Sequence, residues 1–130
     1  AKGVKPGIRV IGVEPAGADD AFRSFKGGTM VSMTDPHTIA DGLRGALADK
    51  TFAVIREKVD DVVTVSEGAI VQAMRSVWEV LKIVIEPSAA VPYAAVIERK
   101  VDVSGKRVGL ILTGGNLDLD CLPWSNAEVL

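Results

Sequence analysis

The stretch Asp61–Val84, DVVTVSEGAIVQAMRSVWEVLKIV, joins a strand pattern directly to a helix pattern. Its first five residues are almost all β-branched or apolar, which is typical of a strand covered on both faces in a parallel sheet. From Ser66 onward, apolar residues recur at intervals of three and four, as on the buried side of a helix: Ala69, Ile70, Ala73, Val77, Val80 and Leu81. Ser66 is well placed as the N-cap, and Glu67 lies at the positive end of the helix dipole. The stretch therefore predicts a strand and then a helix that ends near Val84.

Two further segments have the same strand character, Arg9–Val13 (RVIGV) and Arg107–Leu112 (RVGLIL). Helical patterns lie between the three strands, over Ala18–Phe25, Thr51–Lys58 and Pro87–Arg99. The second of these places Phe52, Ile55 and Val59 on one side of the helix. The order β-α-α-β-α-α-β predicts an α/β fold with right-handed crossovers, in which helices flank an open, mainly parallel sheet.

Three strands are few for such a sheet. The outer two would be long unpaired edges, so the pattern favours a single segment, residues 1–130, of a larger sheet. The opening residues Ala1–Pro6 resemble the polar tail of a helix that turns into a strand, which raises the same expectation of a preceding part. No internal repeat, low-complexity tract or interdomain linker divides the sequence.

Composition narrows the class of protein without identifying a function. Of the 130 residues, 48% are hydrophobic and 25% are charged, which is ordinary for a globular domain. A net charge of −2 and only 5% aromatic residues give no electrostatic or stacking basis for binding nucleic acid. The apolar runs are too short to span a membrane. The single cysteine, Cys121, cannot form an internal disulfide, which favours a reducing, cytoplasmic location.

Ligands of open α/β sheets bind beyond the carboxyl ends of the strands, so the residues that follow each strand are candidates for a site. Glu14, Asp19 and Asp20 place carboxylates in one short loop, where they could bind a hard cation. Alternatively, Asp19 and Asp20 cap the next helix. The turn Thr113–Asn116 (TGGN) offers a hydroxyl and paired glycines. It could hold a ring nitrogen or a phosphate, or simply end the strand.

The remaining polar and aromatic residues give weaker signals. His37 is the only histidine and lies in a polar loop, so catalytic triads and zinc clusters lack partners. Trp78 and Phe52 are interpreted as core residues, and Lys82 as a solvated charge near a helix end. Glu86 interrupts an apolar run just before Pro87. We expect its carboxylate to be partly buried, and such a group needs partners or a function.

Four stretches together resemble the serine/threonine dehydratase and serine racemase family of pyridoxal-phosphate enzymes, fold type II. They occur in the family's order and cover nearly the whole chain: Val13-Glu14-Pro15 with Ala18-Asp19-Asp20, Thr38–Gly42, Ile85–Ala89 and Leu112–Asn116. The resemblance is to the C-terminal part of the large cofactor-binding domain. The Ser-x-Lys-x-Arg-Gly motif with the Schiff-base lysine and the tetraglycine phosphate loop, both N-terminal in that family, do not occur in this sequence. Ser24–Gly28 imitates the lysine motif but lacks its arginine, so Lys26 is not assigned that role.

The resemblance implies roles for individual residues. Thr113 matches the residue that hydrogen-bonds the pyridine nitrogen, and an uncharged partner there makes a weaker electron sink, which suits β-elimination. The other cofactor-binding positions implied are Gly42, Glu86 and Gly114. A divalent cation, magnesium or calcium, is implied at Glu14, the carbonyl of Ala18 and Asp20. A nucleotide at a subunit interface is implied at Lys82 and Asn116. No catalytic residue falls within this segment.

The function implied by the resemblance is α,β-elimination of L-serine or L-threonine to a 2-oxo acid and ammonia, by the intact enzyme rather than by this segment alone. Alternatives within the family are a serine or other amino-acid racemase and a hydroxyaspartate or phenylserine dehydratase. Outside it, a non-enzymatic receiver-like module would need an aspartate where Ser66 stands. The implied partners are the N-terminal part of the same enzyme, a small amino-acid substrate and a second copy in a homodimer, with no nucleic acid or membrane.

Overall fold

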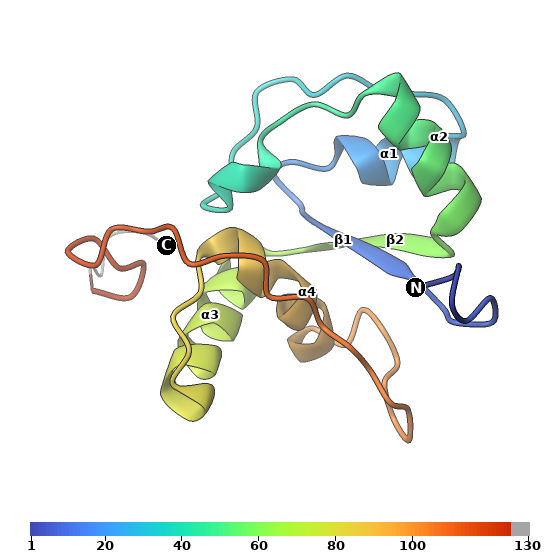
Figure 1. Cartoon of the computed structure of the whole chain (residues 1–130). Helices are drawn as coiled ribbons and strands as arrows, with labels where there is room; N and C mark the ends of the chain where they lie inside the picture. The colour runs from blue at the N-terminus through green and yellow to red at the C-terminus, as the bar shows by residue number, and fades with distance from the viewer. Residues whose placement is uncertain (126–130) are drawn as a thin grey trace.

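The computed structural model describes residues 1–125 as an α/β fold around two parallel strands (Figure 1). The elements in chain order are β1 (Ile11–Pro15), α1 (Asp20–Gly27), the short 3-10 helix η1 (Asp41–Leu43), α2 (Asp49–Lys58), β2 (Asp61–Val65), α3 (Glu67–Leu81) and α4 (Pro87–Ile97). The two strands pair in parallel register from Ile11 opposite Asp61 to Pro15 opposite Val65. Figure 1 shows α1 and α2 on one side of the strands and α3 and α4 on the other. The predicted fold class is confirmed.

The core lies between the strands and the α3–α4 pair. Helix α4 contributes small residues, which let it pack closely: Ala89, Ala90, Val91, Ala94 and Ala95 are all buried. Helix α3 buries Ala69, Ile70, Ala73 and Val77, as its spacing predicts. Val80 and Leu81 complete the predicted stripe but are 72% and 56% exposed. The last turn of α3 therefore presents apolar side chains that the described residues leave largely uncovered.

The helix ends follow local chemistry. The Ser66 hydroxyl accepts a hydrogen bond from the Ala69 amide at 3.2 Å, so the predicted N-cap of α3 is confirmed. Helix α3 ends at Leu81, before the predicted Val84, because Lys82 adopts a left-handed conformation with φ 59°. Helix α4 begins at Pro87 as predicted and ends at Ile97, two residues before the predicted Arg99.

The prediction of a third strand over Arg107–Leu112 is wrong. The segment contains no strand, and Figure 1 shows it passing beside α4 as an irregular chain. A strand requires a neighbouring strand that accepts and donates its backbone hydrogen bonds. In residues 1–125, β1 and β2 pair with each other and the sheet contains only these two strands. One apolar residue of the segment still contributes to the core, because Leu112 packs against it.

The aromatic residues occupy structural positions. Trp78 packs against the core, donates from Nε1 to the Ile85 carbonyl at 3.0 Å, and meets Trp124 edge to face with ring centroids 5.3 Å apart. Phe52, Ile55 and Val59 are half-buried, as the helical spacing predicts. The assignment of Trp78 to the core is confirmed, whereas Phe52 lies outside the core cluster and its ring centroid is 5.9 Å from Cζ of Arg56. Within residues 1–125, no helix is long and apolar enough to cross a membrane.

Candidate functional site

The turn that follows Leu112 is attached to the start of α4 through Glu86. The Glu86 amide donates to the Gly114 carbonyl at 3.0 Å, and Glu86 Oε2 accepts from the Asn116 amide at 2.9 Å. A Cβ atom on Gly114 would lie 2.8 Å from Glu86 Oε1, so only glycine fits there without a shift. Glu86 is half-buried, as predicted. Three predicted site residues, Glu86, Gly114 and Asn116, therefore meet, and Thr113 is exposed beside them.

Gly42 reaches the same end of α4 from the other side. Its amide donates to Ser88 Oγ at 3.1 Å and to Asp41 Oδ1 at 2.8 Å. A Cβ atom on Gly42 would lie 3.0 Å from Ser88 Oγ, a contact tighter than side chains normally make. Ser88 is the second residue of α4, whose start is fixed by Pro87. The structure thus gathers Gly42, Glu86 and Gly114 around the positive end of one helix.

The segment that carries Gly42 is held at several points that the sequence did not identify. The His37 amide donates to the Gly17 carbonyl at 2.9 Å, and a Cβ atom on Gly17 would lie only 1.8 Å from the His37 carbonyl oxygen. The Arg44 guanidinium donates to the Thr38 carbonyl from Nε at 3.0 Å and from Nη2 at 2.5 Å. Ser88 lies inside a motif singled out from the sequence, but no role was predicted for Ser88 or Arg44.

Glu14 lies near the end of β1 and Asp20 is the first residue of α1, so the prediction that both lie in one loop is wrong: they lie on either side of it. Glu14 Oε2 accepts from the Phe22 amide at 2.7 Å and Oε1 from the Ala21 amide at 3.3 Å, so Glu14 supplies the helix cap of α1. The expectation that Asp19 and Asp20 cap this helix is wrong. The N-cap residue Asp19 makes no side-chain capping bond and pairs with Arg23 at 2.8 Å. Asp20 is buried and accepts from the Leu47 amide at 2.9 Å.

The surroundings of Glu14 disfavour the negative charge of its carboxylate. The pKa of Glu14 is raised from 4.5 to about 7, chiefly by burial and also by the nearby charge of Asp20, against the lowering effect of the Phe22 hydrogen bond. Carboxylate and carbonyl oxygens are the ligands that magnesium and calcium prefer. In residues 1–125, no three acidic, histidine or cysteine side chains form a metal-binding group. A cation at Glu14 and Asp20 would therefore need carbonyl or water ligands as well, such as the carbonyl of Ala18.

The other residues considered lie apart from these two sites. Lys26 pairs with Asp61 at 2.5 Å. His37 is exposed in a loop, as predicted, 3.1 Å from Asp35. Lys82 Nζ donates to the Glu79 carbonyl at the end of its own helix, at 2.6 Å. The nucleotide site implied at Lys82 and Asn116 stays a prediction.

Comparison with known proteins identifies the family of this chain and the class of its fold. The family model described as "Pyridoxal-phosphate dependent enzyme" matches residues 1–114 of this chain. Among curated proteins, the chain is 48% identical over 120 residues to beta-hydroxyaspartate dehydratase of Paracoccus denitrificans, covering 92% of this chain and 38% of that protein. It is 45% identical over 127 residues to serine racemase of Arabidopsis thaliana, covering 94% of this chain and 38% of that protein.

The solved structures agree with the sequence comparison. The structure of maize serine racemase superposes with a TM-score of 0.86 at 41% identity, covering 92% of this chain and 38% of that one. The family and the α/β fold predicted from the sequence are thereby confirmed. The chain spans about two fifths of the length of the curated relatives it matches, given the 38% shares.

Proposed function

Since this chain belongs to the pyridoxal-phosphate dependent enzyme family, we propose that it is the C-terminal part of the large domain of a hydroxy-amino-acid ammonia-lyase. The longer protein would convert L-serine or L-threonine to a 2-oxo acid and ammonia. The observation that carries the proposal is that two backbone segments are attached to the start of α4, Gly42 through Ser88 and Gly114 through Glu86, next to the exposed Thr113. A flat ligand bound there would have backbone on one side and the Thr113 hydroxyl at its end.

The residues of this chain would bind and orient the cofactor. Pyridoxal phosphate, when bound, supplies an electron sink for bonds at the α-carbon of an amino acid. The Thr113 hydroxyl would hydrogen-bond the ring nitrogen without adding a charge. Glu86 would hold the turn in place through the Asn116 amide. Gly42, which has no side chain, would let the backbone lie against the ring.

A racemase is the second candidate, because a serine racemase is 45% identical to this chain. Hydroxyaspartate is an alternative substrate for the lyase, because a beta-hydroxyaspartate dehydratase is 48% identical. The residues described above serve both reactions, since they bind the cofactor rather than the substrate's leaving group. Product analysis distinguishes the candidates: a lyase releases a 2-oxo acid and ammonia, and a racemase releases the other enantiomer.

The proposed site also includes a divalent cation, magnesium or calcium, bound by Glu14, the carbonyl of Ala18 and Asp20. The neighbouring carboxylates and the raised pKa of Glu14 support it, because a cation would neutralise charges that burial makes costly. The Phe22 and Ala21 amides already bind Glu14 and would orient its carboxylate. The cation would then connect β1 to the start of α1.

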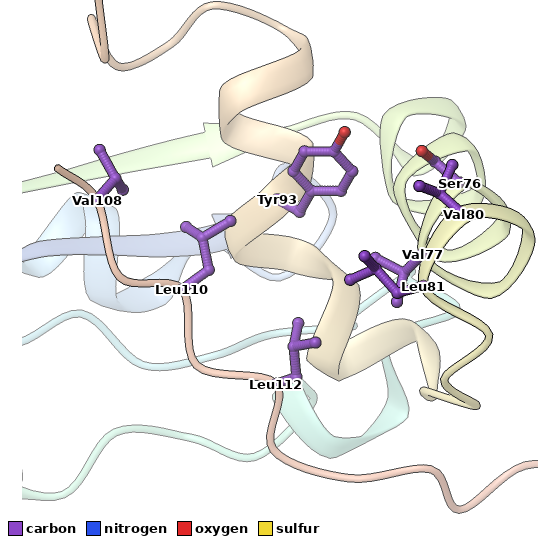
Figure 2. Close-up of a pocket in the computed structure, with 8 residues that line it drawn as sticks. All are labelled: Ser76, Val77, Val80, Leu81, Tyr93, Val108, Leu110 and Leu112. Carbon is purple, nitrogen blue, oxygen red and sulfur yellow. The ribbon is translucent and has the colours of Figure 1, made fainter. Parts of the chain in front are cut away.

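The N-terminal part of the same protein is the proposed partner. A groove of about 440 Å³ opens between α3, α4 and the irregular segment, lined by Ser76, Val77, Val80, Leu81, Tyr93, Val108, Leu110 and Leu112 (Figure 2). Figure 2 shows that Leu110 and Leu112 project from the segment that was predicted as a strand. An adjoining strand from the rest of the protein would satisfy that backbone and cover the groove. A homodimer of the whole protein stays a prediction.

The proposal is tested first by the absorption spectrum of the full-length protein, recorded beside its intact mass. A visible cofactor band that borohydride bleaches, together with 2-oxo acid release from L-serine, L-threonine or hydroxyaspartate, is the expected result. A cofactor-bound protein that only interconverts enantiomers would replace the lyase with the racemase. Absence of the band from the correctly folded protein would refute both candidates.

Thr113 is tested in the same protein. Thr113→Ala should lower turnover about tenfold or more, as loss of one functional hydrogen bond implies. Thr51→Ala is a matched control, because Thr51 is exposed in α2, away from the site. Undiminished turnover of Thr113→Ala would remove Thr113 from the mechanism.

A further inference from the structure

The segment Thr38–Gly42 crosses the first turn of α3 before it reaches Ser88. There, Glu67 Oε2 accepts a hydrogen bond from the Ile39 amide at 2.8 Å. Thr38 and Ala40, on either side of Ile39, are 6% and 0% exposed. The backbone of the segment is therefore fixed in the interior only three residues before Gly42.

The position of Glu67 makes this contact well defined. Glu67 is the first residue of α3, which follows the N-cap Ser66. A carboxylate at this end of a helix is stabilised by the helix dipole. Its other oxygen, Oε1, is fully buried and has no hydrogen-bond partner within residues 1–125. The sequence signal for Glu67 was its helix-end position alone, and the contact 28 residues away was not predicted.

We infer that Glu67 is a positioning residue for the cofactor: its carboxylate fixes the Ile39 amide and thereby the approach of the Gly42 backbone to the site. The inference rests on the proposed function only for the identity of the ligand. Two contacts define the path, from Glu67 to Ile39 and from Ser88 to Gly42. Between them, η1 is closed by the hydrogen bond from the Leu43 amide to the Ala40 carbonyl at 2.9 Å. Displacement of Ile39 would therefore be transmitted to Gly42.

The first test is hydrogen exchange of the full-length protein, measured by mass spectrometry on peptides that cover residues 37–44. Glu67→Ala should raise exchange in these peptides about tenfold or more, because the hydrogen bond to a charged acceptor is lost. Glu67→Gln should keep nearly the native rate, since its amide oxygen can accept from Ile39. The amide nitrogen of the new glutamine would then take the place of Oε1. Because Oε1 has no hydrogen-bond partner within residues 1–125, this substitution breaks no hydrogen bond there.

Glu98→Ala is the matched control. The Glu98 carboxylate accepts from the Ser66 hydroxyl at 2.5 Å, so it supports the same end of α3 without touching the Gly42 segment. We expect this variant to leave exchange over residues 37–44 unchanged. Equal increases in Glu98→Ala and Glu67→Ala would show a general effect of the helix end and overturn the inference, as would unchanged exchange in Glu67→Ala.

The second test is the affinity of the same variants for pyridoxal phosphate, measured by absorbance titration. Glu67→Ala should weaken binding about tenfold, by the same lost hydrogen bond, and Glu67→Gln should restore it. Faster exchange with unchanged affinity would overturn the positioning role. If the native protein binds no pyridoxal phosphate, the proposed function fails, while the exchange test still decides whether Glu67 fixes the segment.

Discussion

At the scale of single residues, Glu86 acts on the backbone of a turn. Its main chain and its side chain both bind this turn: the backbone amide donates to the Gly114 carbonyl, and the carboxylate accepts from the Asn116 amide. The resemblance implied a glutamate at the edge of the cofactor, and the geometry adds that its charge is already engaged. Its effect on a bound ring would therefore pass through the position of Thr113, the neighbour of Gly114.

Glu14 gives a pH-dependent stability. The pKa of Glu14 is about 7 in the folded protein, against a reference value of 4.5. At a pH between these two values, the folded state therefore retains a proton that the unfolded state has released. The contribution of Glu14 to stability is therefore greatest at low pH and is lost as the pH rises through about 7. Because the side chain is partly exposed, we expect a loss of about 1 kcal/mol rather than the full pKa difference. Thermal unfolding of the full-length protein as a function of pH measures it.

A divalent cation should oppose this loss, because it binds the deprotonated carboxylate. Magnesium should raise the melting temperature more at about pH 8 than at about pH 5.5, where it must displace a proton. Glu14→Gln should abolish both the pH dependence and the response to magnesium. Glu57→Gln makes the same charge change at an exposed site and should preserve both. An equal magnesium response in Glu14→Gln would contradict the proposed cation site.

At the scale of elements, the close crossing at Gly17 links the loop after β1 to the segment that carries Gly42. We predict that Gly17→Ala destabilises the full-length protein by about 3 kcal/mol, because its methyl group would overlap the His37 carbonyl and force both loops to shift. Chemical denaturation measures the change in unfolding free energy.

Gly68→Ala is the matched control for that substitution. Gly68 lies within α3 and a Cβ atom there meets nothing within 4 Å. The same chemical change should therefore stabilise the protein by about 0.5–1 kcal/mol, through helix propensity. Destabilisation of similar size in both variants would show that the crossing at Gly17 is not the cause.

Elements with local signals were predictable, and elements that depend on distant partners were not. Ser66 and Pro87 each carry a cap or start signal within a few residues, and both helices begin where expected. Arg107–Leu112 has an equally strong strand composition, but a strand exists only beside another strand. For the site, motif glycines such as Gly42 and Gly114 were recognisable. The contacts of Glu67 and Gly17 were not, since they join residues that only the tertiary fold brings together.

At the scale of the whole molecule, the apolar groove between α3, α4 and the irregular segment is a candidate binding surface. Exposed apolar side chains gathered in one patch mark a surface that another part of a protein covers. If the N-terminal part covers it, Leu110→Ser should destabilise the full-length protein by about 2 kcal/mol, the value for a buried leucine. Leu110 is 40% exposed in this chain, so its burial here accounts for only part of that loss in unfolding free energy. Denaturant unfolding of the full-length protein measures it.

Val54→Ser is the comparison for this prediction. Val54 is 57% exposed, and its helix α2 lies across the strands from the groove (Figure 1). A surface substitution there should change the unfolding free energy by within about 0.5 kcal/mol. A Leu110→Ser effect no larger than that of Val54→Ser would mean that the groove stays open in the full-length protein.

The contact between Trp78 and Trp124 gives the chain an internal optical probe. These are its only two tryptophans, and their rings meet where α3 and the stretch after Asn116 touch. Indole emission responds to the water around the ring, so the intrinsic fluorescence of this chain reports one junction rather than the whole fold. The helices α1 and α2 could unfold without a direct change in that signal. Fluorescence and circular dichroism, followed together, would therefore distinguish release of this junction from loss of the helices.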